Sequence, residues 1–137
     1  MKIVLDTNCL LPAIFSRSPY SWLWEAFCEG RFTLCCSTEI LREYEELLSE
    51  FYSPDISESV IQTIINAANK EHVVHYFKWG LIFADPDDNK FVDCALNAGA
   101  DCIVTNDKHF NVLKHLYFPS VRVVDIDTFK KIIESRT

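Results

Sequence analysis

The chain has 137 residues, a length typical of one domain, and 49% of them are hydrophobic and 13% aromatic. This composition supplies a packed core and excludes a disordered chain. The formal net charge of −7, taken alone, disfavours a nucleic-acid partner, because phosphates are bound by Lys and Arg.

The first fifteen residues, MKIVLDTNCLLPAIF, give no sign of export or membrane insertion. Asp6 and Asn8 interrupt the apolar run, which a signal peptide or a membrane span would need unbroken. No linker rich in Gly, Pro or Ser divides the chain, and neither glycine-rich nucleotide-binding motif occurs. We therefore expect a single cytoplasmic domain over residues 1–137, with no membrane association.

Six cysteines occur, and no two of them have the C-x-x-C spacing of a zinc site. All lie in apolar or helical contexts. They are expected to be buried, reduced thiols of a cytoplasmic protein.

Short apolar runs alternate with helical patterns in the first half of the chain. The predicted elements are a strand over 2–6, a helix over 19–30, a strand over 31–37, a helix over 38–51 and a helix over 58–69. A proline opens the first helix and a glycine stops it. Ser37 or Thr38 caps the second helix, whose apolar stripe centres near Tyr44. Pro54 is expected to break this helix, and Ser57 to cap the third.

The alternation continues in the second half. The predicted elements are a strand over 72–77, a helix over 88–98, a strand over 101–106, a short helix over 107–115, a strand over 121–126 and a helix over 127–135. Gly99 stops the first of these helices, and Asp127 is expected to cap the last. The pattern predicts an α/β fold, a three-layer sandwich in which a central parallel sheet of about five strands is flanked by helices.

Acidic residues lie where the binding sites of such a sheet form, beyond the carboxyl ends of the strands. Asp6 ends the first predicted strand, Asp107 follows a later one, and Asp88 begins a helix. Glu43 is the helix acid nearest to the edge of its apolar stripe, slightly nearer than Glu45. We expect Asp6, Glu43, Asp88 and Asp107 to meet at one end of the sheet.

Each of these acids also has a purely structural interpretation. Asp6 could end a strand in a turn, Asp88 and Asp107 could be helix caps, and Glu43 could be one more exposed acid. Their convergence on one end of the predicted sheet argues for a shared site instead.

Three stretches, taken in order, resemble the PIN-domain nucleases. They are IVLDTNCLL, STEILREYEELL and DPDDNKFVDCALNAGADCIVTNDKHF. The third is similar to the PIN subfamily described as toxin components of toxin–antitoxin pairs, as is the closing VRVVDIDTF. The acidic positions of the family match Asp6, Glu43, Asp88 and Asp107.

The resemblance implies an endoribonuclease that depends on Mg²⁺ or Mn²⁺, with RNA as substrate, a cognate antitoxin as partner and frequent homodimers. The four matching acids would be the catalytic residues and would hold one or two ions. Carboxylates suit these hard cations, and two ions about 4 Å apart can hold the attacking and leaving oxygens. Two divalent ions would also reduce the formal charge from −7 to −3.

The sequence departs from the family pattern at one position. Many toxins of the VapC type carry a second Asp two positions after the one that matches Asp107, and here that residue is His109. Asp93 is a second-tier candidate ligand, although helix geometry points it away from Asp88.

Several polar residues near the proposed site have candidate supporting roles. Asn8 and Thr105 are expected to fix carboxylate rotamers, with local turn hydrogen bonds as the alternative. Asp85 and Asp87 are expected to shape a loop. The candidate phosphate-binding residues, which could equally be solvated surface charges, are Arg17, Lys90, Lys108 and His109.

Two other functions fit part of the pattern. An aspartyl phosphatase of the haloacid-dehalogenase type also places Asp at the end of its first strand. It needs a second Asp two positions on, where this chain has Asn8. A PIN-like domain with an inactive site, used only to bind nucleic acid or protein, is the other alternative. Metal binding would separate it from a nuclease.

Overall fold

The computed structural model describes residues 1–74, 78–79, 86–115 and 120–136. The strands are β1 (Lys2–Leu5), β2 (Thr33–Ser37), β3 (Lys70–Val73), β4 (Cys102–Val104) and β5 (Val123–Val124). The α-helices are α1 (Thr7–Ile14), α2 (Ser21–Cys28), α3 (Thr38–Phe51), α4 (Pro54–Asn66), α5 (Asn89–Ala98) and α6 (Ile126–Ser135). Two 3₁₀ helices, η1 (Pro86–Asp88) and η2 (Lys108–His115), flank α5 and β4 along the chain.

The five strands form one parallel sheet with the order β3-β2-β1-β4-β5. The chain runs outward from β1 to β3 and then returns to add β4 on the other side of β1. The strand order therefore reverses between β1 and β4, and ligands of open α/β sheets bind at such a reversal. Leu5 pairs with Val104 at this point, so β1 and β4 end side by side.

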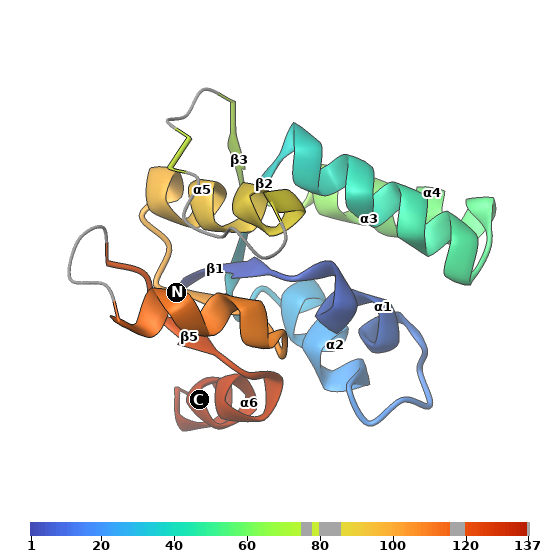
Figure 1. Cartoon of the computed structure of the whole chain (residues 1–137). Helices are drawn as coiled ribbons and strands as arrows, with labels where there is room; N and C mark the ends of the chain where they lie inside the picture. Colours follow the sequence, from blue (N-terminus) through green and yellow to red (C-terminus); the bar gives the residue numbers. More distant parts are fainter. Residues whose placement is uncertain (75–77, 80–85, 116–119, 137) are drawn as a thin grey trace.

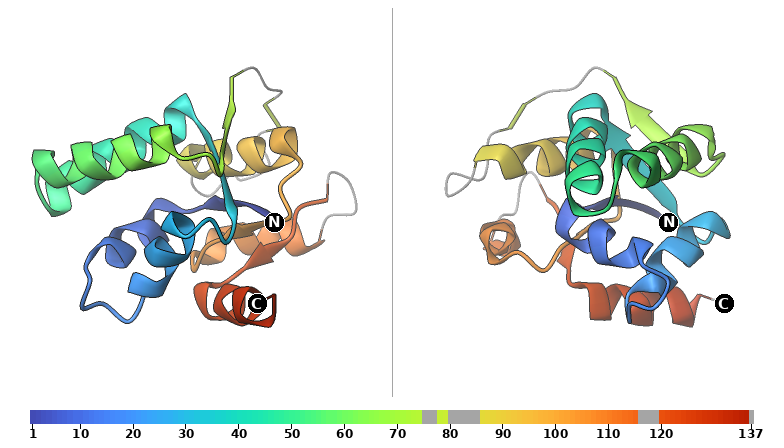
Figure 2. Two further views of the ribbon diagram at one scale, coloured as in Figure 1. Left: turned by 180° about the vertical axis from the view of Figure 1, so that it is seen from behind. Right: turned by 90° about the vertical axis from the view of Figure 1, so that its right-hand side faces the viewer.

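Helices cover both faces of the sheet (Figure 1). On one face, α5 contacts β1, β2, β3 and β4. On the opposite face lie α2 and α6 (Figure 2), joined through an aromatic cluster in which the rings of Trp22 and Phe129 are 6.1 Å apart and those of Phe32 and Phe129 are 5.4 Å apart. This arrangement confirms the predicted three-layer sandwich.

The α3–α4 hairpin extends beyond the sheet (Figure 1), yet α3 is firmly attached at its inner end. The Ser37 side chain caps α3 by accepting a hydrogen bond from the backbone N–H of Ile40. Tyr44 is completely buried, and its hydroxyl donates to the carbonyl oxygen of Leu5, the last residue of β1. These contacts fix the distance between α3 and the carboxyl end of the central strand.

Most predicted boundaries agree with the structure, including the end of α5 at Gly99, which takes a left-handed φ of 65°. Two caps were predicted two or more residues too late. α3 ends at Phe51, ahead of Pro54 as expected, but Pro54 also opens α4, because Ser53 rather than Ser57 caps that helix. Asp125, not Asp127, caps α6 by accepting the N–H of Thr128.

Four further features differ from the expectation. The segment after Asp6 is the helix α1, which the sequence did not predict, and residues 108–115 are 3₁₀ rather than α-helical. All six cysteines are free, but Cys28 is exposed whereas the other five are buried. The predicted strand over 72–77 overlaps β3 only at its start, and residues 75–77 lie outside the described ranges.

No helix within the described ranges is long and apolar enough to cross a membrane.

Candidate functional site

Asp6 lies at the junction of β1 and α1, buried to 4% exposure. Its carboxylate caps α1 by accepting the backbone N–H of Asn8 at 3.4 Å, and Oδ2 accepts the hydroxyl of Thr105 at 2.7 Å. Burial raises the pKa of Asp6 above its ordinary value. The hydrogen bonds from Thr105 and Asn8 oppose this rise, and the nearby carboxylates of Asp107 and Glu43 add to it.

Thr105 joins the two central strands at their carboxyl ends. Its hydroxyl donates to Asp6 and accepts the backbone N–H of Asp107 at 3.0 Å. One hydroxyl therefore orients an acid from the end of β1 and the backbone of an acid that follows β4. Thr105 thus makes both the carboxylate contact predicted for it and the local turn hydrogen bond given as the alternative.

Asp107 and Asp88 face each other across His109. Nδ1 of His109 lies 3.5 Å from Oδ2 of Asp88 and 3.5 Å from Oδ1 of Asp107. The donor atoms of these three residues all lie within 4.8 Å of one another. Asp107 also accepts the backbone N–H of His109 at 2.9 Å, a local capping contact. Asp88 stands at the start of α5, but its carboxylate does not cap that helix.

Glu43 reaches the same region from α3. Its side chain is 26% exposed, whereas its neighbours Glu45 and Glu46 point to solvent. Oε2 accepts the hydroxyl of Thr7, in the first turn of α1, and Oε1 lies 2.8 Å from Nζ of Lys90 in α5. Glu43 thus contacts the residue after Asp6 and a residue two positions after Asp88.

The structure therefore brings all four predicted acids to the carboxyl end of the sheet. Crowded carboxylates repel one another, and a divalent cation among them converts this repulsion into binding. The all-oxygen donors of Asp6, Glu43, Asp88 and Asp107 fit Mg²⁺ or Mn²⁺. Burial is the main cause of the raised pKa of Asp6, and the carboxylates of Asp107 and Glu43 add a smaller contribution.

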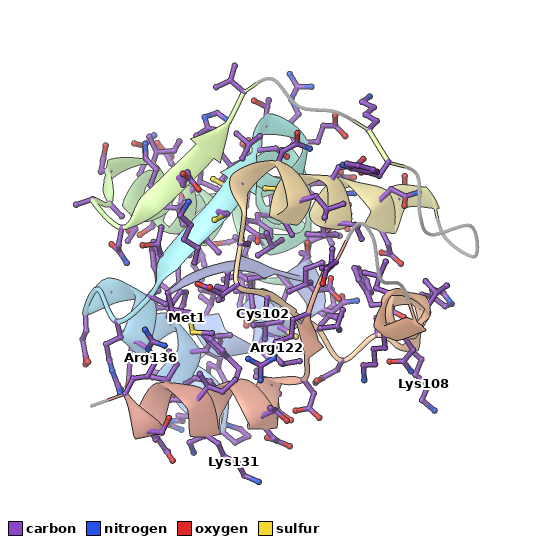
Figure 3. The ribbon with its side chains drawn as sticks, turned by 90° about the vertical axis from the view of Figure 1, so that its left-hand side faces the viewer. Met1, Cys102, Lys108, Arg122, Lys131 and Arg136 are labelled. Atoms are coloured by element: carbon purple, nitrogen blue, oxygen red, sulfur yellow. The ribbon has the colours of Figure 1, made fainter. Side chains whose placement is uncertain are left out.

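The other predicted residues are distributed unevenly around this cluster. Lys90 and His109 contact its acids, as described above. Arg17 is exposed between α1 and α2, and Lys108 is exposed and projects outward from η2 (Figure 3). The side chain of Asn8 is exposed, so the atom that contacts Asp6 is its backbone nitrogen.

Three other acids named from the sequence are buried away from the cluster, exposed to solvent, or outside the described ranges. Asp93 is buried in α5, and its Oδ1 accepts the backbone N–H of Trp79 at 2.8 Å. It thereby holds a segment of chain that precedes the site. Asp87 is exposed within η1, and Asp85 lies outside the described residues.

Sequence reasoning missed the polar contacts made by Thr7, Lys90 and Tyr44. Thr7 had a visible signal, because it follows the first acid directly and a helix begins there. Two of these contacts join segments that are distant in the sequence, so no local pattern predicts them. They are Lys90 with Glu43 and Tyr44 with Leu5.

A family model described as a PIN domain matches residues 2–109, so the chain belongs to the PIN domain family. No curated protein matches the sequence. Among solved structures, the chain is similar to VapBC2 from Rickettsia felis bound to a DNA fragment from its promoter. The identity is 19% and the TM-score is 0.61, over 91% of this chain and 98% of that one. It is also similar to DNA-bound VapBC from Salmonella typhimurium, with 18% identity and a TM-score of 0.59 over 92% and 98%. These two likenesses establish the shared fold.

Proposed function

We propose that this protein is a metal-dependent endoribonuclease that hydrolyses RNA phosphodiester bonds and serves as the toxin of a toxin–antitoxin pair. One observation carries the proposal. The Thr105 hydroxyl binds both Asp6 and the backbone of Asp107, which joins acids from two adjacent strand ends at the reversal point of the sheet. Asp88 and Glu43 lie beside them, and membership of the PIN family supports nuclease chemistry at this cluster.

The chemistry follows from the donor set. Asp6, Asp88 and Asp107, with Glu43, would hold one or two Mg²⁺ or Mn²⁺ ions. A bound ion would supply a water of lowered pKa and would neutralise charge on the phosphate. The hydroxyl of Thr105 and the backbone N–H of Asn8 each bind one oxygen of the Asp6 carboxylate and hold it in one orientation. Lys90 places a positive charge beside Glu43, where the phosphate backbone of RNA would pass.

The toxin assignment is supported by the sequence resemblance and by the two similar structures, which are of VapBC proteins bound to DNA. We propose that a small antitoxin is encoded next to this chain and covers the acidic cluster. We also propose that the chain forms a homodimer in the cytoplasm. Inspection of the adjacent open reading frame, followed by co-purification and sedimentation analysis, tests these partners.

The nuclease proposal is tested by incubating purified protein with single-stranded RNA and Mn²⁺ or Mg²⁺. Cleavage should stop in excess chelator and in the variants Asp6→Asn, Asp88→Asn and Asp107→Asn. Asp127→Asn, an exposed acid of α6, is the matched control and should cleave normally. Equal cleavage in chelator would refute metal dependence.

A folded protein that takes up neither ion in calorimetry, and cleaves no RNA, would favour the binding-module alternative. In that case Asp6→Asn would leave RNA or protein binding unchanged. Circular dichroism of each variant excludes unfolding as the cause of lost activity.

A further inference from the structure

The imidazole of His109 occupies the space between two candidate metal-binding acids. Its Nδ1 is equally distant, at 3.5 Å, from Oδ2 of Asp88 and Oδ1 of Asp107. Neighbouring ligands of an ion bound at about 2.0–2.5 Å lie about 3–3.5 Å apart. The two distances from Nδ1 thus match those between neighbouring donors to one ion, and one donor atom from each of the three residues lies within 4.8 Å of the others.

The position of this ring is fixed by the chain. Asp107 and His109 share the tight turn that opens η2, and the backbone N–H of His109 donates to Oδ1 of Asp107 at 2.9 Å. Phe110, the next residue, is fully buried and anchors the turn, with its ring 6.5 Å from that of Phe91 in α5. His109 itself is 46% exposed, so the ring is not a core residue.

We infer that His109 is a metal ligand, which with Asp88 and Asp107 forms a mixed imidazole–carboxylate set that favours Mn²⁺ over Mg²⁺. The inference rests on the proposed metal-dependent function. Mg²⁺ strongly prefers oxygen ligands, whereas imidazole nitrogen binds first-row transition ions. A nitrogen donor therefore distinguishes two ions that an all-carboxylate site would bind alike. In the ligating tautomer the proton stays on Nε2 and Nδ1 is left to bind the ion.

Pulsed EPR of the Mn²⁺-loaded protein provides the direct test, because it detects the ¹⁴N coupling of a coordinated imidazole. We expect this coupling in the wild type and its loss in His109→Ala and His109→Asp. His72→Ala is the matched control. His72 lies on β3 and contacts Thr38, so its replacement should leave the coupling intact.

Calorimetric titration provides the second readout. His109→Ala should weaken Mn²⁺ binding at least about tenfold, since loss of even an outer partner of a ligand commonly costs that much. Mg²⁺ binding should change far less, and His109→Asp should shift the preference toward Mg²⁺.

The outcomes separate this inference from the proposed function. If the wild type binds Mn²⁺ and cleaves RNA but shows no ¹⁴N coupling, His109 is not a ligand and the proposed nuclease function still holds. Coupling that persists in His109→Ala would have the same meaning. Absence of Mn²⁺ binding in the wild type would overturn both. If His109→Ala fails to fold, His109→Asp, which keeps a polar side chain at this exposed position, gives the same two readouts.

Discussion

Nζ of Lys90 lies 2.8 Å from Oε1 of Glu43, so a cation from α5 neutralises an acid from α3 within the candidate site. Both side chains are largely shielded, with 13% and 26% of their surfaces exposed. A divalent ion that enters the cluster must therefore compete with an ammonium group that is already in place.

Replacement of Lys90 by Gln should tighten divalent-ion binding. Removal of one positive charge near a divalent ion should raise the affinity for that ion about three- to tenfold at the effective dielectric constant of a protein surface. Calorimetric titration with Mn²⁺ measures the change, and Lys130→Gln, on α6 near Trp22, is the remote control. Unchanged or weaker binding in Lys90→Gln would contradict this electrostatic account.

Asp6→Asn should be more stable than the wild type at neutral pH when metal is removed. Burial raises the folded-state pKa of Asp6 above 3.8, so ionising the carboxylate costs folding free energy. The cost is absent below pH 3.8, grows as the pH rises through the folded-state pKa, and then stays constant. Asn keeps the cap on α1, because it is as good an N-cap as Asp.

Thermal melts in chelator between pH 4 and pH 8 measure this difference. Asp125→Asn is the control, because this substitution should lower stability where Asp6→Asn raises it. The hydrogen bond from Thr128 lowers the pKa of Asp125, so the wild type gains stability above pH 3.8 and loses it as the pH falls through the lowered value. A pH-independent gap between wild type and Asp6→Asn would show that burial of charge is not the cause.

Tyr44→Phe should destabilise the fold by about 1–3 kcal/mol, because the buried carbonyl of Leu5 loses its hydroxyl donor. The same contact fixes α3 against the end of β1, so Mn²⁺ affinity should fall as well. Urea unfolding and metal titration check the two effects. Tyr20→Phe, at a half-buried position before α2, should alter neither.

Thr105→Val removes the hydroxyl that joins Asp6 to the backbone of Asp107 while keeping nearly the same shape. Metal affinity and RNA cleavage should each fall about 10- to 100-fold, the usual effect of losing an outer partner. Thr105→Ser restores the hydroxyl and should restore most of both. If Val and Ser behave alike, the hydroxyl does not position the acids.

Local signals allowed most of the fold to be predicted. Ser37 fixes the start of α3 by capping Ile40, three residues away, and the apolar stripe around Tyr44 marks the buried face of this helix. Gly99 ends α5 by its own backbone conformation. α1 escaped prediction because its apolar residues lack a clear polar face and Pro12 lies within it. The cap of α4 was predicted at Ser57 instead of Ser53, because a proline that ends one helix can also open the next.

The acids of the site could be predicted because strand ends and helix starts are visible in the sequence. The contacts that these acids make with other residues of the site could not be predicted from the sequence. His109 meets Asp88 only after β4 docks beside β1 and brings η2 against the start of α5, which depends on the whole sheet. The hydrogen bond that Asp93 provides to Trp79 likewise depends on the path of a connection that no periodic pattern describes.

The order of the strands also controls when the acidic cluster can exist. Asp6 is synthesised well before its partner Thr105, which lies 99 positions later in the chain. A nascent chain that has reached only β3 carries β1 and Glu43, yet neither Asp88 nor Asp107. Closing a contact over such a separation is slow and comes late in folding. The acidic cluster is therefore incomplete on a nascent chain until the segment that carries Asp107 has been made and β4 has paired with β1.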